Sequence, residues 1–192
     1  MKTIRFAAAI ISLLVMSACG PLLSLNPLWD EGHAVSEPAL TGTWISGDDD
    51  NEIITIAESG RNGYRMTYID DDSSSRYEVH AVRLEGRLFL DLYPDGAALG
   101  KRLEGEVYLP VIPTHFFLRA VLEGDRLELA ALDDEGIANK LERREIEVPL
   151  LKLEDGVLLT AQTDRIQDLV VRFVDDPDLW SDTELYHRCC GK

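Results

Sequence analysis

The chain has 192 residues, with 19 Lys and Arg against 35 Asp and Glu, so its formal net charge is −16. This charge argues against nucleic acid or an anionic membrane surface as the partner, because both are bound through positively charged faces. Apolar residues make up 45% of the chain, which excludes an acidic disordered protein and suits one ordinary domain with its own core.

Residues 1–18 have the layout of a signal peptide. Lys2 and Arg5 precede an apolar run from Phe6 to Met16, which is too short for a permanent membrane-spanning helix. The run ends in Met16-Ser17-Ala18-Cys19, which resembles the lipobox of bacterial lipoproteins with Met in place of the usual Leu. The resemblance implies cleavage before Cys19, a diacylglyceryl group on its sulfur, and a further acyl chain such as palmitate on the new amine. Two or three acyl chains give stable anchoring.

Gly20 follows this cysteine directly. In the sorting rule of Gram-negative lipoproteins, Asp at this position retains the protein in the inner membrane, so Gly20 implies the outer membrane, with the domain facing the periplasm. Display on the cell surface stays open, as does an ordinary secretory signal with an incidental cysteine. Cleavage removes two cationic residues and no acid, so the mature chain carries −18. The lipid, rather than charge attraction, would hold so acidic a domain at an anionic membrane.

Residues 19–38 contain three prolines without a clear hydrophobic period. We expect them to form the lipidated N-terminus and a tether that keeps the domain off the membrane, although Leu25, Leu28 and Trp29 can pack on the domain. Residues 39–192 then form a single β-rich domain with a C-terminal tail.

From Leu40 onward the dominant hydrophobic period is two, which is typical of strands. Several runs are joined by an acidic residue with a glycine, as at Glu85-Gly86 and Gly124-Asp125, and this pairing favours tight hairpin turns. The strand-like runs are nine in number: 43–46, 52–57, 63–69, 76–84, 87–92, 116–122, 126–132, 146–153 and 156–161.

Two segments have a helical period. Residues 164–174 carry an apolar stripe, and Thr163 or Asp164 can cap this helix, with Gln167 at capping-box spacing from Asp164. A shorter helix is predicted over 135–143. The predicted fold is therefore mainly β: an antiparallel meander closed or nearly closed into a small lipocalin-like barrel, with an α-helix from the C-terminal half packed on it. Closure removes the exposed edges that an open sheet of this length would leave.

Gly42-Thr43-Trp44 begins the first predicted strand and is similar to the Gly-x-Trp signature of lipocalins. That resemblance implies an eight-stranded barrel with Trp44 across its closed end and a helix after the last strands. The runs 88–94, 113–117, 127–134 and 158–167 look like a group of uncharacterised exported bacterial proteins. The group carries no assigned activity, so it supports the strand and helix predictions and transfers no site.

The four histidines, His33, His80, His115 and His187, show no metal-ligand spacing, and the chain has no nucleophile or phosphate-loop motif. We therefore expect no enzyme, metal or cofactor. His115, which begins an apolar strand, either lines the mouth of a cavity or is an ordinary hydrogen-bonded residue at a strand end. Trp44 and His115 are the candidate ligand-binding residues.

Three other features remain open. The acidic clusters 48–51 and 70–73 are solvated turn tips or opportunistic divalent-ion sites. Cys189 and Cys190 are adjacent and close only a strained ring, so they form a vicinal or intermolecular disulfide, a soft-metal tail with His187, or an incidental end. Residues 94–114 form a lid over the barrel or one more irregular strand.

These patterns lead to two functional hypotheses. The first is a lipid-anchored lipoprotein whose lipocalin-like cavity binds an apolar or amphipathic small molecule, since eight strands enclose about one small ligand or a filled interior. The second is a non-enzymatic protein-interaction module of the periplasm or outer membrane.

Overall fold

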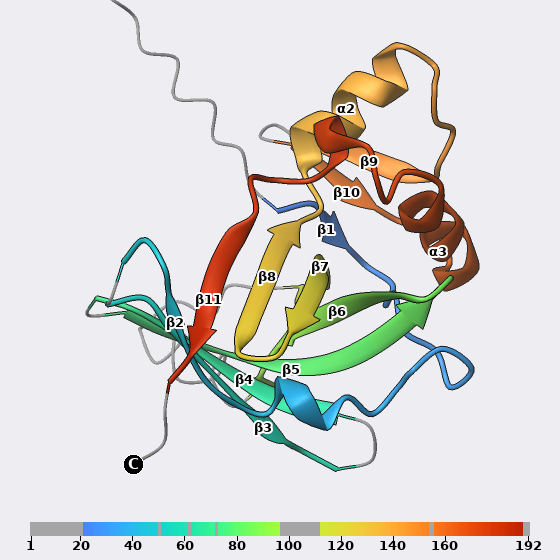
Figure 1. Ribbon diagram of the computed structural model, residues 1–192. Coiled ribbons are helices and arrows are strands. Elements are labelled where there is room, and N and C mark those ends of the chain that lie inside the picture. Colours follow the sequence, from blue (N-terminus) through green and yellow to red (C-terminus); the bar gives the residue numbers. More distant parts are fainter. Residues whose placement is uncertain are drawn as a thin grey trace, which may run out of the picture.

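The computed structural model describes residues 21–49, 51–60, 63–71, 73–96, 112–153 and 156–189. Eight antiparallel strands close into a barrel, and a second layer of short strands and helices covers one side of it (Figure 1). The predicted fold class, a small β-barrel with a helix from the C-terminal half packed on it, is confirmed.

The barrel is a meander with one interruption, because its last strand joins after a long excursion. Each strand pairs antiparallel with the next, and the last strand closes the barrel between the first and the seventh. The barrel strands are β2 (Gly42–Ser46), β3 (Ile53–Glu58), β4 (Gly63–Asp70), β5 (Ser73–Leu84), β6 (Arg87–Pro94), β7 (Phe116–Glu123), β8 (Arg126–Ala131) and β11 (Glu184–Arg188).

The expected hairpin turns are present. Glu85 and Gly86 join β5 to β6 with φ values of 47° and 82°, and two positive values in succession define the tight turn that matches strand twist. Gly124, between β7 and β8, has φ 61°. Glycine is favoured at such positions because a Cβ disfavours positive φ.

Side chains alternate between the inside and the outside of the barrel and so form two cores. The inner core is capped at one end by the short helix η1 (Pro38–Leu40), whose Leu40 is buried. Its other fully or almost fully buried members are Trp44, Ile54, Ile56, Tyr64, Met66, Val79, Ala81, Leu88, Leu90, Leu92, Ala120, Leu127, Leu129 and Tyr186.

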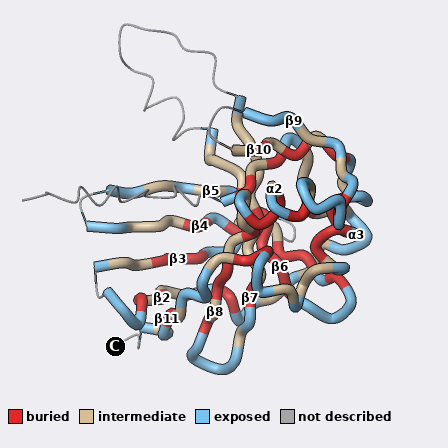
Figure 2. Tube along the Cα trace, turned by 90° about the horizontal axis from the view of Figure 1, so that it is seen from above, coloured by how far each residue is buried: buried red, intermediate tan, exposed pale blue. Residues whose placement is uncertain are grey.

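The outer core lies between the barrel wall and the second layer, where Figure 2 shows buried segments in α2 and α3. This layer holds a three-stranded sheet in the order β1-β10-β9. The layer is made of β1 (Leu23–Ser24), α2 (Asp134–Glu142), β9 (Leu150–Leu153), β10 (Gly156–Leu159), α3 (Thr163–Arg172) and the short helix η2 (Pro177–Leu179).

Two strand assignments and the place of the helix differ from the expectation. The runs 146–153 and 156–161 do not join the barrel, since β9 and β10 pair with each other and with β1 outside it. The eighth barrel strand is instead β11, which the sequence patterns did not indicate. The helices therefore precede the last barrel strand rather than follow it, although their bounds agree with the predicted ones to within two residues.

The expected tether is also different. From Pro21 the chain packs on the barrel, and the side chains of Leu22 and Leu28 are completely buried in the outer core. Residues 21–38 are therefore part of the domain. Among the residues that the structure describes, none of the helices has the length and apolar character needed to cross a membrane.

Candidate functional site

Trp44 is completely buried in the inner core of the barrel, together with Leu40 of η1. Its Nε1 donates a hydrogen bond to the Leu40 carbonyl at 2.9 Å, and the Arg188 guanidinium carbon lies 4.1 Å from the centre of its ring. Gly42, two residues earlier, has φ 147°, and a Cβ there would come within 2.5 Å of Arg188 Nη1. The Gly-x-Trp motif therefore packs Trp44 between Leu40 and Arg188 at the end of the barrel that η1 covers. The Arg188 guanidinium covers the face of the ring that it contacts.

The opposite end of the barrel interior is polar. The Tyr186 hydroxyl contacts carboxylate oxygens of Glu52 and of Glu184, the latter at 2.8 Å. Burial and the nearby Glu52 carboxylate raise the pKa of Tyr68 to about 12, and burial together with hydrogen bonds to both carboxylates raises the pKa of Tyr186 further. Both phenols therefore stay protonated at neutral pH, where they donate hydrogen bonds and do not act as bases.

Between these ends the inner core is filled by apolar side chains, such as Ile56, Leu90 and Leu127, whose exposure is at most 2%. Three hollows that are lined by described residues lie outside the barrel.

His115 lies on the outer surface of the barrel wall and faces Asp91. Its Nδ1 is 2.7 Å from Asp91 Oδ1, while Asp91 Oδ2 accepts the backbone N–H groups of Leu28 at 2.6 Å and Trp29 at 3.3 Å. The backbone of His115 also pairs with that of Ser24 through two hydrogen bonds, at 2.8 and 2.9 Å. Asp91 is only 1% exposed. This junction of a carboxylate and an imidazole fastens the N-terminal segment to the barrel.

The helix α3 holds the same segment from the other side. Thr163 Oγ1 donates to the Pro27 carbonyl at 2.8 Å, and Gln167 Nε2 donates to the Leu28 carbonyl at 2.8 Å. The expected capping box is therefore wrong: the residue before the helix, Gln162, makes no capping hydrogen bond with its side chain, and Thr163 and Gln167 bind the N-terminal segment instead. Asn26 Nδ2 adds a hydrogen bond to the Ala161 carbonyl at 2.8 Å.

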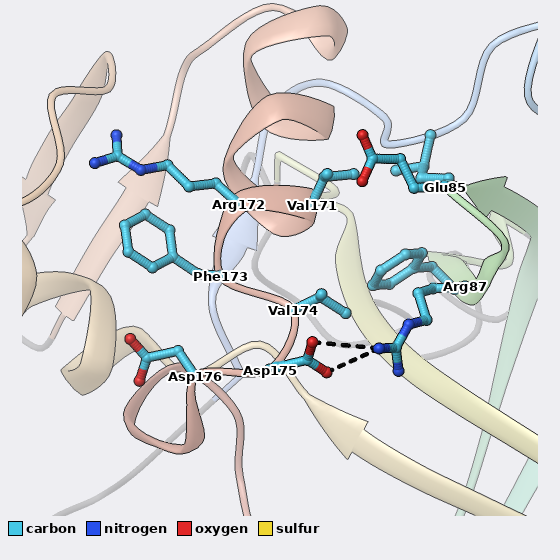
Figure 3. Close-up of a pocket in the computed structure, with 10 residues that line it drawn as sticks. Glu85, Arg87, Val171, Arg172, Phe173, Val174, Asp175 and Asp176 are labelled. Carbon is cyan, nitrogen blue, oxygen red and sulfur yellow. Dashed lines mark hydrogen bonds and ion pairs between the residues drawn. The ribbon is translucent and has the colours of Figure 1, made fainter.

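The largest of the three hollows is a groove of about 560 Å³ between the β5–β6 turn and the end of α3 (Figure 3). Half of its ten lining residues are apolar and half are charged. Arg87 reaches across to the Asp175 carboxylate at 3.1 Å, and this ion pair is largely exposed. We call this hollow the α3 groove. Its lining is Leu84, Glu85, Arg87, Phe89, Val171, Arg172, Phe173, Val174, Asp175 and Asp176.

A second hollow of about 270 Å³ lies on the other side of Arg172 and Phe173, which line both hollows. The Arg172 guanidinium lies 4.9 Å from the centre of the Phe173 ring, and so does the Lys140 ammonium. Together the two hollows border the end of α3 with apolar side chains and charges of both signs.

One residue of the α3 groove, Asp176, forms a tightly held ion pair with a lysine behind it. Lys140, 5% exposed in its side chain, lies 2.6 Å from Asp176 and 3.4 Å from Glu145. The hydrogen bond to Lys140 lowers the pKa of Asp176, and the same bond raises the pKa of Lys140. This part of the groove is therefore fixed in geometry and charge at neutral pH.

The acidic clusters look like turn tips where they are described. Asp49 Oδ1 accepts the backbone N–H of Asn51 at 2.9 Å, and the Asp70 carbonyl accepts the Ser73 hydroxyl at 2.9 Å. Within the described part of the chain, no three His, Cys, Asp or Glu side chains are placed to hold a metal ion. Cys189 is an exposed free thiol. Cys19, Cys190 and residues 97–111 of the expected lid lie outside the described residues.

The two candidate ligand residues are not brought together, because Trp44 points into the barrel and His115 lies on its outer face. Two features were missed by the sequence analysis: the role of Asp91 and the α3 groove. An acidic residue between Leu90 and Leu92 in an otherwise apolar strand was the available signal for Asp91. Nothing local indicates the groove, which forms only when the β5–β6 turn meets α3.

No protein-family model, curated protein or solved structure compared with the chain matches it.

Proposed function

We propose that the chain is a lipid-anchored lipoprotein of the cell envelope whose domain is a non-enzymatic protein-interaction module. The acylated Cys19 anchors the chain in the outer membrane, and the domain faces the periplasm. The partner surface is the α3 groove. The observation that carries the proposal is the combination of apolar side chains and charges of both signs in the lining of one groove.

The composition of the groove favours a polypeptide over a small molecule. Small-molecule pockets are lined predominantly by apolar side chains and bury most of their ligand. Here five of ten lining residues are charged, and the other five, Phe89 and Val174 among them, are apolar. Arginines and aromatic rings surrounded by a polar rim are typical of protein interfaces. The fitting partner is an extended segment with apolar side chains and charges of both signs.

The exposed ion pair across the groove is exchangeable. Arg87 and Asp175 have side-chain exposures of 54% and 72%, and pairs so exposed contribute at most about 1 kcal/mol. A partner carboxylate can therefore replace Asp175 as the acceptor of Arg87 at little cost. The Lys140–Asp176 pair does not exchange in this way, because it is buried on the lysine side.

The hypothesis of a small molecule inside the barrel has less support. Buried side chains, Trp44 and Tyr186 among them, fill the inner core, and an interior ligand would have to displace them. A bound amphipathic small molecule is therefore one of the outcomes that the crosslinking experiment distinguishes.

The proposal is tested by photocrosslinking in intact cells. A photoreactive amino acid replaces Arg87 at the groove, and Arg126 at the start of β8 serves as the matched control. Both arginines are about half exposed, at 54% and 52%, and each forms one ion pair with an acidic residue. We expect position 87 to capture a distinct envelope protein that position 126 does not capture. The same products from both positions, or a co-purifying small molecule with no captured protein, would contradict the proposal.

A further inference from the structure

The outer face of the three-stranded sheet is made of leucines. Strand pairing sets Leu23 beside Leu158 and Leu158 beside Leu151, so these three form one row across the sheet. Leu153 lies two residues after Leu151 on β9 and thus on the same face. Leu25 follows β1 directly, and its backbone N–H donates to the Leu159 carbonyl at 2.9 Å, so it adjoins this sheet. We call Leu23, Leu25, Leu151, Leu153 and Leu158 the leucine face.

No member of the leucine face belongs to either core or packs against one. The opposite face of the same sheet does the packing, through Val157, Leu159 and Leu150. Among the described residues, five large apolar side chains are at least 40% exposed, and three of them, Leu25, Leu151 and Leu153, are on this face. Contiguous exposed apolar patches mark interaction surfaces, whereas scattered apolar residues do not.

The leucine face lies next to the point where the chain meets its anchor. Leu23 follows Cys19 by four residues, and four residues span at most about 14 Å when fully extended. The segment after Leu23 cannot lengthen this reach, because Asp91, Thr163 and Gln167 hold it on the domain. An acylated Cys19 therefore holds this side of the domain beside the bilayer.

We propose that the leucine face rests on the bilayer that holds the lipid anchor, with its side chains at the boundary between headgroups and acyl chains. This inference rests on the proposed acylation of Cys19. The side chains of a sheet face can enter that boundary and add to the binding from the acyl chains. The surface then sets the orientation of the domain, so that the anchor and the sheet act as two contacts.

The test is quenching of tryptophan emission in vesicles that contain the lipidated full-length mature protein. The vesicles are phosphatidylethanolamine and phosphatidylglycerol with brominated acyl chains, which quench only tryptophans in contact with them. Leu153→Trp reports on the leucine face. Val121→Trp is the matched control, since Val121 is 42% exposed against 50% for Leu153. Figure 2 shows the β7–β8 turn, which follows Val121 closely in sequence, on the opposite side of the molecule from β9. The unsubstituted protein gives the baseline of its three tryptophans.

We expect brominated lipids to lower the added emission of Leu153→Trp by about twofold or more and to leave that of Val121→Trp unchanged. Adding Leu151→Ser to Leu153→Trp should reduce this quenching while the protein stays anchored. If brominated lipids quench the added emission of both variants to the same extent on a lipidated protein, the inference is overturned and the anchor is left intact. A concentration-dependent dimer without quenching would assign the face to a second copy and overturn it as well. An unmodified Cys19, read from the mass of the same sample, would instead overturn the proposed function.

Discussion

Replacing Asp91 by alanine is expected to loosen the N-terminal segment and to destabilise the whole domain. The carboxylate is 1% exposed and accepts hydrogen bonds from the backbone N–H groups of Leu28 and Trp29 and contacts the His115 ring. Leu28 is fully buried, so its N–H would lose its acceptor away from water. The substitution thus leaves one buried donor and one partly buried imidazole without the group that they bind.

The magnitude follows from these contacts. An unsatisfied buried donor costs about 1–3 kcal/mol, and a hydrogen bond to a charged group such as this carboxylate contributes about 1.5–3 kcal/mol. We expect Asp91→Ala to lower the free energy of unfolding by about 3–5 kcal/mol. For a domain of this size each kcal/mol corresponds to roughly 2–4 °C in Tm, so the expected fall is on the order of 10 °C.

The assay is urea unfolding followed by tryptophan fluorescence, with Asp175→Ala as the control. Asp175 is also an aspartate in an ion pair, but its pair is exposed, so its loss should cost less than about 1 kcal/mol. Hydrogen exchange of residues 22–30 should rise in Asp91→Ala and stay unchanged in the control. If Asp91→Ala costs no more than Asp175→Ala, the junction does not hold the segment and the reasoning is refuted.

Three further results are expected. Arg188→Ala removes the guanidinium that covers the signature tryptophan and its hydrogen bonds to backbone carbonyls, and should lower the free energy of unfolding by about 1–3 kcal/mol; an unchanged urea midpoint would refute this. The lowered pKa of Asp176 means that its pairing stabilises the fold above the ordinary pKa and that this contribution is lost as the pH falls through the lowered value. Thermal unfolding of Lys140→Met between pH 2 and pH 5, taken as a rough range for carboxylates, should therefore depend less on pH than that of the native protein. Glu52→Gln removes a carboxylate that raises the pKa of Tyr68, so ultraviolet titration should show this phenol ionising below its value of about 12; an unchanged titration would contradict the assignment.

Much of the barrel could be predicted because its determinants are local. Alternating side chains and turns such as Glu85-Gly86 report the strands and their hairpins, and an apolar stripe reports α3, since each depends on residues close in sequence. The pairing of 150–153 and 156–159 was also visible as a hairpin. The sequence does not show which sheet this hairpin joins, because its place depends on contact with Leu23 and Ser24, more than a hundred residues away.

The missing pieces are those that depend on distant contacts. Strand β11 has five residues and obtains its place from pairing with both β8 and β2 rather than from its own pattern. Gln167 fitted a capping box by spacing, yet the nearby Leu28 carbonyl offers its side chain a buried hydrogen bond. The N-terminal prolines resembled a tether because nothing in their own composition reveals the buried carboxylate of Asp91. Trp44 lies on β2 in the inner core, and its strand could be predicted because the alternation of side chains is local.

The proposed acylation of Cys19 underlies both the proposed function and the proposed orientation of the domain, and the mass of the protein tests it most directly. The protein is extracted from its own membranes in detergent, and its intact mass and N-terminal peptide are measured. The expected result is a chain that begins at Cys19 and carries a diacylglyceryl group and an amide-linked acyl chain. A chain that begins at any other residue, or one with an unmodified Cys19, would contradict the account.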